Sequence, residues 1–411
     1  MTCSRSCSSR AAVALVVAAA LAAGVGCAGG RPRPREERLR VALLPPDNLT
    51  GGMAPVREVE AALELALARR GVDVVAGDQV SLFLAANRLR YTGAVDPLMA
   101  GLAHEALGVD GIVVTSLELY AASPPRIAIV ARLVSATAAP ELLWIDGVAR
   151  AGDDTKGLLG LGAVGSVEQL RSEAVNALAS SLARFANGGR QPSQCEGGIR
   201  FGPRVTFRST WLEGSGTVSV AVLPFLNQTK RKNAGEILAL EFVRQLSAVP
   251  SVRVLEPGAV RADLLRFRVV YADGVSLENS RLLAAALDVD LVLSGTVREL
   301  SDAGTPRVDF SAALVEKGSK QVVWQSTSYS TGTDGVVLFD FGTIRTSHAL
   351  ACRMARKVVE EMGFDDRRRS APRAAPALDA TTAAADRASQ NSAPAAQSLQ
   401  KTQGQQAPIT P

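Results

Sequence analysis

The feature that most constrains this chain is a decapeptide that occurs twice. One copy, V-A-L-L-P-P-D-N-L-T, begins at Val41, and V-A-V-L-P-F-L-N-Q-T begins at Val220, 179 positions later. The register persists, because the Leu-Leu-Trp that ends at Trp144 corresponds to the Val-Val-Trp that ends at Trp324, 180 positions later. A period this long is the size of a domain rather than of a solenoid unit. The sequence therefore predicts a duplicated domain, with copies at 39–187 and 217–364.

Both copies show the same succession of patterns. Short apolar runs indicate strands that are covered on both faces, and amphipathic stretches between them indicate helices. The predicted fold class is α/β, with two tandem copies of a βαβαβ-plus-hairpin sandwich and a carboxy-terminal helix in each. In the first copy the expected strands are 41–44, 72–75, 112–119, 127–134 and 142–149, and the expected helices are 54–70, a segment that starts at 96–97, and 167–185. In the second copy the expected strands are 220–225, 252–255, 291–300, 308–315 and 321–328, and the expected helices are one after 233, 277–287 and 346–362.

Helix periodicity also predicts which side chains are buried. In the helix that begins at Asp96 and Pro97, the expected buried stripe leaves His104 on the solvent side. In the second copy, Asn233 and Glu236 are expected to cap a helix. The predicted stripe of the helix after Asp96 is Leu98, Leu102 and Ala106 with Met99, Ala103 and Leu107, and the predicted core residues of the helix after Asn233 are Leu238, Phe242 and Leu246.

The amino terminus resembles a bacterial lipoprotein signal peptide. The first ten residues contain Arg5 and Arg10, an apolar run covers 11–23, and small residues precede Cys27. The run is shorter than the roughly 20 residues that a bilayer-spanning helix needs, so it predicts an export signal at 1–26. The resemblance implies that Cys27 is lipidated and that Ala28 directs the protein to the outer membrane. The alternative is a soluble exported protein that is cleaved near Ala23 or Gly26.

Three segments are predicted to lie outside the two copies. Residues 27–38 are charged and contain proline, which suits a tether. Residues 188–216 are rich in Gly, Pro, Ser and Gln and are predicted to be a linker. Residues 365–411 are rich in Ala, Pro, Ser and Gln and are predicted to be disordered. The net charge of +5 comes from the two termini, because residues 39–364 carry −1. With 4% aromatic residues as well, the composition argues against nucleic-acid binding.

Two cysteines remain after the leader and the lipidated Cys27. Cys195 and Cys352 could form a disulfide in an oxidising compartment, and the alternative is two unpaired thiols, with Cys352 buried on a helix. The chain has only two histidines, and the cysteines lack metal-ligand spacing. The sequence therefore predicts no metal and no cofactor.

Several motifs are candidates for catalytic or binding features. The G-x-G-x-x-G run at 160–165 precedes a helix but follows a hairpin strand, so nucleotide binding is not expected. Asp153 and Asp154 suit a turn better than a carboxylate pair. No serine or cysteine nucleophile accompanies His348 in a known motif, which predicts that the protein is not an enzyme. Trp144 and Trp324 are candidate interface anchors, although packing beneath the last helix of each copy is the favoured interpretation.

Three motifs carry a resemblance to a family. The strand at Val222–Thr229, the V-D-L-V-L-S-G-T-V run at 289–297 and the late V-V-W strand at 322–324 resemble a group of bacterial envelope proteins. This group includes the curli secretion lipoprotein CsgG, the penicillin-binding-protein activator lipoproteins and the TolB amino-terminal domain. The resemblance implies a non-catalytic α/β sandwich that binds envelope proteins or itself.

The expected function is therefore a lipid-anchored, periplasm-facing module that binds proteins in envelope assembly or secretion. The alternative is a CsgG-like subunit of an oligomeric outer-membrane pore. A membrane strand needs about 9 to 11 alternating residues. The candidate bridges, 151–164 and 331–341, are each too short for a pair of such strands, which favours the binding module.

Overall fold

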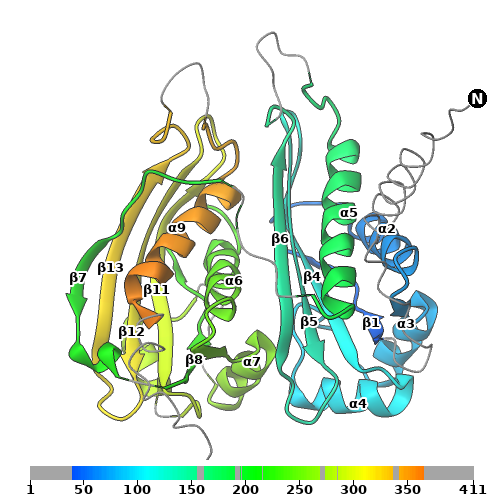
Figure 1. The fold of residues 1–411 in the computed structure, drawn as a ribbon. Coiled ribbons are helices and arrows are strands. Elements are labelled where there is room, and N and C mark those ends of the chain that lie inside the picture. Colours follow the sequence, from blue (N-terminus) through cyan, green and yellow to red (C-terminus); the bar gives the residue numbers. More distant parts are fainter. Residues whose placement is uncertain are drawn as a thin grey trace, which may run out of the picture. The chain divides into compact units, whose positions relative to one another are not determined.

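The computed structural model describes residues 39–154, 162–189, 195, 197–214, 216–268, 274–284, 286–336 and 342–364. The predicted leader (1–26), tether (27–38) and tail (365–411) lie outside the described residues, as does Cys27. The described part is a mixed α/β structure with a six-stranded sheet, a seven-stranded sheet and eight α-helices (Figure 1). No helix within it has the length and apolar character needed to cross a bilayer.

The first sheet has the strand order β3-β1-β4-β5-β6, and β2 also pairs with β4. β1 is parallel to β3 and β4, whereas β4, β5 and β6 are antiparallel, as the predicted hairpin requires. The strands are β1 (Arg40–Leu43), β2 (Asp47–Asn48), β3 (Asp73–Val74), β4 (Gly111–Ala122), β5 (Pro125–Ser135) and β6 (Leu142–Ala151). The accompanying helices are α2 (Val56–Ala68), α3 (Gly77–Ala86), α4 (Pro97–Leu107) and α5 (Val167–Ala186).

The second sheet has the order β10-β8-β11-β12-β13-β7, and β9 also pairs with β11. Its strands are β7 (Arg204–Arg208), β8 (Val218–Val222), β9 (Leu226–Asn227), β10 (Val252–Val254), β11 (Leu291–Ser301), β12 (Arg307–Glu316) and β13 (Val322–Thr331). Its helices are α6 (Ala234–Ser247), α7 (Pro257–Arg266), α8 (Leu277–Ala284) and α9 (Ser347–Met362), and a short 3₁₀ helix covers Thr210–Glu213.

The two valines that begin the repeated decapeptide occupy corresponding places in the two sheets. Val41 lies opposite Val74 on one side and Gly111 on the other. Val220 lies opposite Val254 and Leu291, each 180 positions further along the chain. Apart from β7, the strand order of the second sheet follows that of the first.

Each sheet packs one face against a pair of long helices. The first sheet buries Leu117, Ile129 and Trp144 against α2 and α5. The second sheet buries Leu293, Phe310 and Trp324 against α6 and α9. Shorter helices cover one end of the opposite faces, α3 and α4 on the first sheet and α7 and α8 on the second.

Helices α6 and α9 lie between the two sheets (Figure 1). Val130 and Ile145 of the first sheet belong to the same apolar cluster as the second sheet and its helices. Twelve of the fourteen residues of α6 are buried, because both of its faces are covered. Because α6 has neighbours on both sides, its polar residues Glu241, Arg244 and Gln245 are also buried. They belong to the candidate functional site.

At three places the structure differs from the local predictions. The segment 188–216 contains β7, which pairs with β13, because its alternating residues can extend the second sheet although all five are exposed. In α4, Met99 and Ala103 of the predicted stripe are buried together with Ala100, whereas Leu98 is 67% exposed and Ala106 is also exposed, so the prediction is half right. Asn233 adopts a left-handed conformation and makes no side-chain cap.

Other local predictions agree with the structure. Asp96 accepts a hydrogen bond from the Met99 amide at 2.8 Å, as an N-cap does. Ser166 accepts from the amides of Glu168 and Gln169 at the start of α5. Two helices were not anticipated, α3 and α7, which are each ten residues long.

Candidate functional site

The candidate site is the buried polar layer where the first sheet meets α6, α9 and the loop before α6. Charged side chains are rarely buried without partners, because the loss of hydration is costly. Here they come from both sheets and from chain positions more than a hundred residues apart. We divide the layer into three clusters, named for their arginines.

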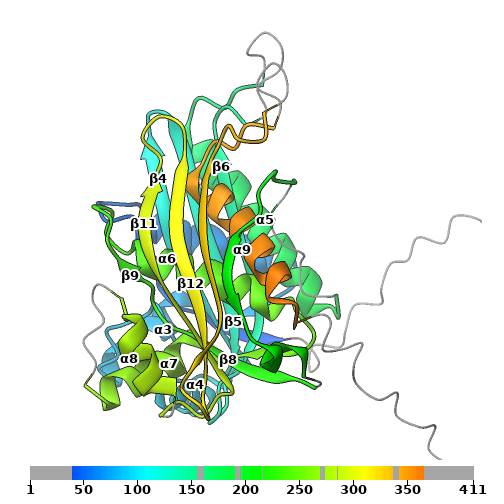
Figure 2. The same cartoon turned by 90° about the vertical axis from the view of Figure 1, so that its left-hand side faces the viewer.

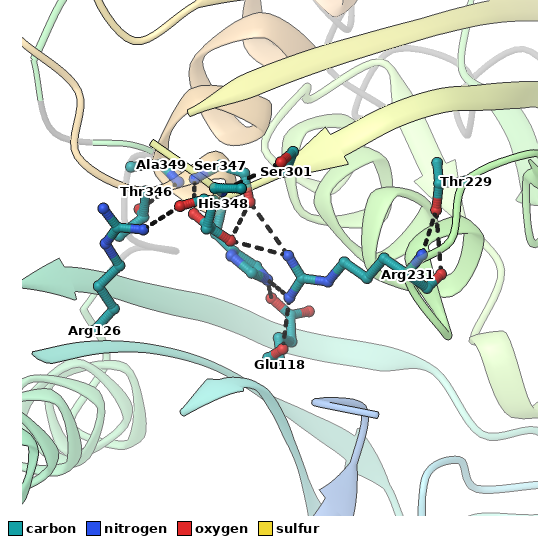
Figure 3. Close-up of polar contacts among 11 residues, drawn as sticks. Glu118, Arg126, Thr229, Arg231, Ser301, Thr346, Ser347, His348 and Ala349 are labelled. Carbon is teal, nitrogen blue, oxygen red and sulfur yellow. Dashed lines mark hydrogen bonds and ion pairs between the residues drawn. The ribbon is translucent and has the colours of Figure 1, made fainter. Parts of the chain in front are cut away.

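The Arg231 cluster joins the end of β4 to the start of α9 (Figure 3). The Arg231 guanidinium donates to Asp302 Oδ2 at 3.0 Å, to the Glu118 carbonyl at 2.9 Å and to His348 Nε2 at 3.1 Å. Asp302 also accepts from the Ser347 amide and hydroxyl at 2.6 and 2.7 Å. One arginine therefore links β4 of the first sheet to Asp302, which directly follows β11, and to α9 of the second.

Burial determines the charge of the groups around Arg231. Desolvation, followed by the nearby Arg231 charge, lowers the pKa of His348 to about 3, so the imidazole is neutral. Desolvation and then the repulsion of Glu241 raise the pKa of Glu118 well above its usual value. The pKa of Asp302 is lowered, because burial, which alone would raise it, is outweighed by the Ser347 hydrogen bonds and the Arg231 charge.

Ser347, His348 and Asp302 are three residue types of a hydrolytic triad, but their connections differ from those of a triad. A triad requires the serine to donate to the histidine and the histidine to donate to the aspartate. Here Ser347 donates to Asp302, and His348 Nε2 accepts from Arg231. The histidine therefore has no role as a base for this serine, and the three side chains connect β11 to α9.

The Arg244 cluster lies deeper, on α6. Arg244 donates to Asp146 of β6 at 2.9 Å and lies 3.7 Å from the Glu241 carboxylate. It also contacts the sulfur of Cys352, which forms a disulfide with Cys195. Desolvation raises the pKa of Glu241 to about 7. This cluster ties the edge strand of the first sheet to both helices between the sheets.

The Arg132 cluster is at the opposite end of α6. Arg132 of β5 and Glu256, the N-cap of α7, approach to 3.4 Å, and their side chains are 1% and 0% exposed. Beside them, Tyr91 donates to Glu236 at 3.3 Å, and the Arg261 guanidinium lies 3.8 Å from the centre of the Tyr91 ring. This cluster fastens the first sheet to α6 and α7.

A groove of about 710 Å³ opens between the Arg231 and Arg244 clusters. Its floor is the segment 146–151 of β6, and its walls come from α5 on one side and the start of α9 on the other. Glu118 and Glu241 line it, and neither carboxylate oxygen of Glu118 has a hydrogen-bond partner among the described residues. A volume in this range is typical of ligand sites.

The structure brings some of the predicted site residues into this layer and leaves others outside it. Cys195 and Cys352 form a disulfide beside the groove. Gly160 and Leu161 of the G-x-G-x-x-G run lie outside the described residues. Asp154 accepts from the Ala151 amide at 2.7 Å and Asp153 lies 3.4 Å from Arg345, so this pair is part of a turn. Within the described ranges, no group of acidic, histidine or cysteine side chains could hold a metal ion.

The two tryptophans are not at the surface. Trp144 and Trp324 are each 0% exposed and pack beneath α5 and α9 respectively. The suggestion that they anchor an interface is therefore wrong, and the packing alternative describes both. The physical reason is that each lies on the helix-covered face of its sheet.

Sequence reasoning missed the charged residues of the buried layer. Glu118 occurs within a largely apolar strand, and Glu241 and Arg244 occur within the largely apolar stretch I-L-A-L-E-F-V-R-Q-L. A charge inside an apolar run is a signal of a buried polar contact. The sequence does not show which partner each charge meets, because the partners lie in the other half of the chain.

Comparisons with known proteins give structural likeness only. No protein-family model and no curated protein matches the chain. Its structure is similar to a PelC dodecamer from Paraburkholderia phytofirmans, with 22% identity and a TM-score of 0.26, covering 39% of this chain and 96% of that one. It is also similar to the lipoprotein GNA1162 from Neisseria meningitidis, with 21% identity and a TM-score of 0.27, covering 35% of this chain and 98% of that one.

Proposed function

We propose that this chain is a lipid-anchored, non-catalytic protein-binding module of a bacterial envelope, built from two tandem copies of one α/β unit. The observation that carries the proposal is the connection of Ser347, His348 and Asp302. These groups link β4, β11 and α9 through Arg231, and the neutral His348 accepts a hydrogen bond rather than activating a nucleophile. The buried polar layer thus holds two units together as one body that presents its outer surfaces to partners.

The disulfide supports a periplasmic location for this module. Disulfides persist in oxidising compartments such as the periplasm and are rare in the cytosol. The Cys195–Cys352 bond joins the connector between the sheets to α9. It is consistent with an export leader at 1–26 and with lipidation of Cys27. We propose attachment to the outer membrane on its periplasmic side.

The corresponding strand orders support the tandem copies. In each sheet a parallel trio of strands leads into an antiparallel hairpin, and a long helix follows the hairpin. Val41 and Val220 have partners at corresponding positions. The proposal follows the resemblance to CsgG, the penicillin-binding-protein activators and TolB only as far as a protein-binding role.

Metabolic labelling with radioactive palmitate tests the anchor. We expect the wild-type chain and a Cys7→Ala control to carry label and to fractionate with outer membranes. A Cys27→Ala variant should lose the label, because the sulfur that accepts the acyl chain is gone. Label that persists in Cys27→Ala would refute lipidation at this position.

Crosslinking in intact cells tests the binding role. A photoreactive residue is placed at Tyr329, which is 57% exposed on the second sheet, or at Leu65, which is 52% exposed on α2. We expect discrete adducts with another envelope protein from at least one face. Absence of adducts at both positions would count against a binding module. Ring-shaped particles with conductance in planar bilayers would instead favour the pore.

A further inference from the structure

The arginines of the Arg231 and Arg244 clusters already have carboxylate partners. Arg231 donates to Asp302 at 3.0 Å, and Arg244 donates to Asp146 at 2.9 Å. Each of these charge-assisted pairs balances one positive charge with one negative charge. A further carboxyl in either cluster therefore exceeds the positive charge that these arginines supply.

Two further carboxyls belong to the clusters, Glu118 of β4 and Glu241 of α6. They are buried, because the residues are 1% and 3% exposed. Arg231 donates to the backbone carbonyl of Glu118 rather than to its carboxylate (Figure 3). His348 Nε2 lies 3.8 Å from Glu118 Oε2, and Arg244 lies 3.7 Å from Glu241 Oε2, both beyond hydrogen-bond distance. Both oxygens of Glu118 and Oε2 of Glu241 thus have no hydrogen-bond partner among the described residues.

Both carboxyls line the groove of about 710 Å³. The hydroxyls of Ser181 and Thr343 line it as well, and they also have no hydrogen-bond partner in the described part of the chain. Ser181 comes from α5 and is 6% exposed. A hydroxyl oxygen can accept a hydrogen bond, as a carboxylate does. Because an unpaired buried acceptor is costly, the groove favours a ligand that donates hydrogen bonds.

The arginines on the groove wall are engaged with other groups. Arg345 lies 3.4 Å from Asp153, and Arg353 donates to the Gly198 carbonyl at 3.2 Å. Arg150 also has an interaction within the chain. No side chain of the described residues donates to the three unpaired carboxylate oxygens. A cation that reaches these oxygens would therefore be a ligand.

The electrostatic surroundings of the two carboxyls agree with a missing positive charge. Desolvation, followed by the repulsion of Glu241, raises the pKa of Glu118 well above its usual value. Desolvation raises the pKa of Glu241 to about 7. The other charged groups that act on the two carboxyls are Arg231, Arg244, Asp146 and Glu236. The attraction of the two arginines does not offset burial, so a further cation in the groove would stabilise the ionised carboxylates.

The lining of the groove favours an organic cation over a metal ion. Within the described ranges, no group of acidic, histidine or cysteine side chains could hold a metal ion. Apolar side chains, among them Val130 and Ile344, line the groove together with the carboxyls. An alkyl chain with a charged end fits such a mixed surface, in the way that the stem of a lysine side chain covers apolar atoms.

We propose that the groove binds a small organic cation with two primary amino groups, of the alkyldiamine class, whose ammonium groups meet Glu118 and Glu241. Two positive charges balance the two carboxylates, and the alkyl chain between them contacts the apolar lining. This ligand site goes beyond the proposed protein-binding function and does not depend on it.

Isothermal titration calorimetry of the full chain in detergent tests the site. The probe is cadaverine, an alkyldiamine, and the matched probes are pentylamine, which has one amino group, and pentanediol, which has none. We expect cadaverine to bind about tenfold or more tightly than pentylamine, because it makes one more charge-assisted contact, and we expect no binding of pentanediol. The affinity for cadaverine should rise between pH 6 and pH 8, because the carboxyls bind the ammonium groups in their ionised form.

Matched variants locate the binding. Glu118→Gln and Glu241→Gln keep the size of the side chain and remove its charge, and each should weaken cadaverine binding about tenfold or more. Glu105→Gln makes the same change at an exposed carboxyl on α4 and should bind cadaverine like the wild type. Ala177→Trp places a large ring at an exposed position of α5 that lines the groove, and it should weaken binding without changing a charge.

The comparison of the three probes on the wild-type chain gives an answer even where a variant does not fold. The proposal is overturned if cadaverine does not bind, if it binds no more tightly than pentylamine, or if Glu118→Gln and Glu241→Gln both bind it like the wild type. Binding of a lysine-containing peptide without binding of cadaverine would also overturn it and would assign the groove to a side chain of a partner protein. Crosslinking from Tyr329 and Leu65 does not involve the groove, so it tests the protein-binding function separately.

Discussion

The first and second sheets have corresponding strands. They differ in the face that is turned away from α2 and α5 in the first sheet and from α6 and α9 in the second, both in its chemistry and in what covers it. On the first sheet, Val130 and Ile145 are 2% and 1% exposed beneath α6 and α9. The corresponding residues of the second sheet are Ser311 and Gln325, which are partly exposed. Figure 2 turns this face of β11 and β12 toward the viewer, with α7 and α8 near its lower end. One face is covered and combines apolar side chains with the buried charged clusters, and the other is polar and open.

This difference explains why helices cover this face of the first sheet and leave most of the corresponding face of the second sheet open. Apolar side chains on a sheet face favour its covering by helices, since each buried apolar side chain contributes about 1.5 to 3 kcal/mol. The polar outer face of the second sheet lacks this driving force. It carries ion pairs instead, such as Arg298 with Asp309 at 2.6 Å. We therefore expect this face to remain in water or to meet a polar partner.

The same contrast applies to charge. The Arg132–Glu256 pair is almost completely buried between the two halves, whereas the side chains of Arg298 and Asp309 are 38% and 26% exposed. Removing one partner of a buried pair leaves an unpaired charge, while an exposed pair is screened by water. Matched substitutions can therefore measure how firmly the buried layer holds the halves together.

The largest expected effect is that of Glu256→Ala. Because it leaves the Arg132 guanidinium buried without its partner, we expect it to lower the free energy of unfolding by about 3 to 5 kcal/mol in urea titrations. Asp309→Ala, the control on the open face, should cost about 1 kcal/mol or less. Combining Glu256→Met with Arg132→Met should recover part of the loss. Equal costs for Glu256→Ala and Asp309→Ala would refute the distinction between the two faces.

A smaller effect is expected from Glu241→Gln, and it depends on pH. The folded pKa of Glu241 is about 7 against a usual 4.5, so the group's contribution to stability is complete below pH 4.5 and is lost as the pH rises through 7. Glutamine does not titrate. Between pH 4 and pH 8, the stability of the variant relative to the wild type should therefore rise by about 3 kcal/mol at most.

His348→Gln provides a control of opposite sign. The folded pKa of His348 is about 3, below the usual 6.5, so its contribution is complete above pH 6.5 and is lost as the pH falls toward 3. This variant should gain stability relative to the wild type on acidification. Chemical denaturation at a series of pH values checks both signs. A Glu241→Gln curve parallel to that of the wild type would contradict burial of this carboxyl in the layer.

The sequence patterns predicted the helices and strands better than the contacts between them. Strong apolar runs such as Val41–Leu44 and the Asp96-Pro97 helix start depend on local chemistry, which is why they could be recognised. Helix α3 was missed although Val80, Phe83 and Leu84 have helical spacing, because the segment is short. Strand β7 was missed because all of its residues are exposed and only its pairing with β13 makes it a strand.

The candidate site was less predictable, for a physical reason. Periodicity shows that a sheet face is apolar or polar, but it does not identify the helix that covers it. Glu118 was part of a predicted strand, yet its neighbours Arg231 and His348 come from segments more than a hundred residues away. The pairing of Cys195 with Cys352 remained one of two alternatives for the same reason, since the sequence does not give the distance between the two cysteines in the fold.

The smallest expected effect, an exchange between the two faces, isolates the role of polarity. Val130→Ser gives the covered face the side chain that the open face has at Ser311, and it should cost about 2 kcal/mol, because it removes buried apolar surface and adds a hydroxyl that must find a partner. The reverse change, Ser311→Val, adds apolar surface where no helix covers the sheet and should change the free energy of unfolding by about 0.5 kcal/mol or less. Urea denaturation of both variants measures the difference. If Ser311→Val instead stabilised the chain with a concentration dependence, the open face would associate with a second copy, and the polar side chains of this sheet would be what keeps the copies apart.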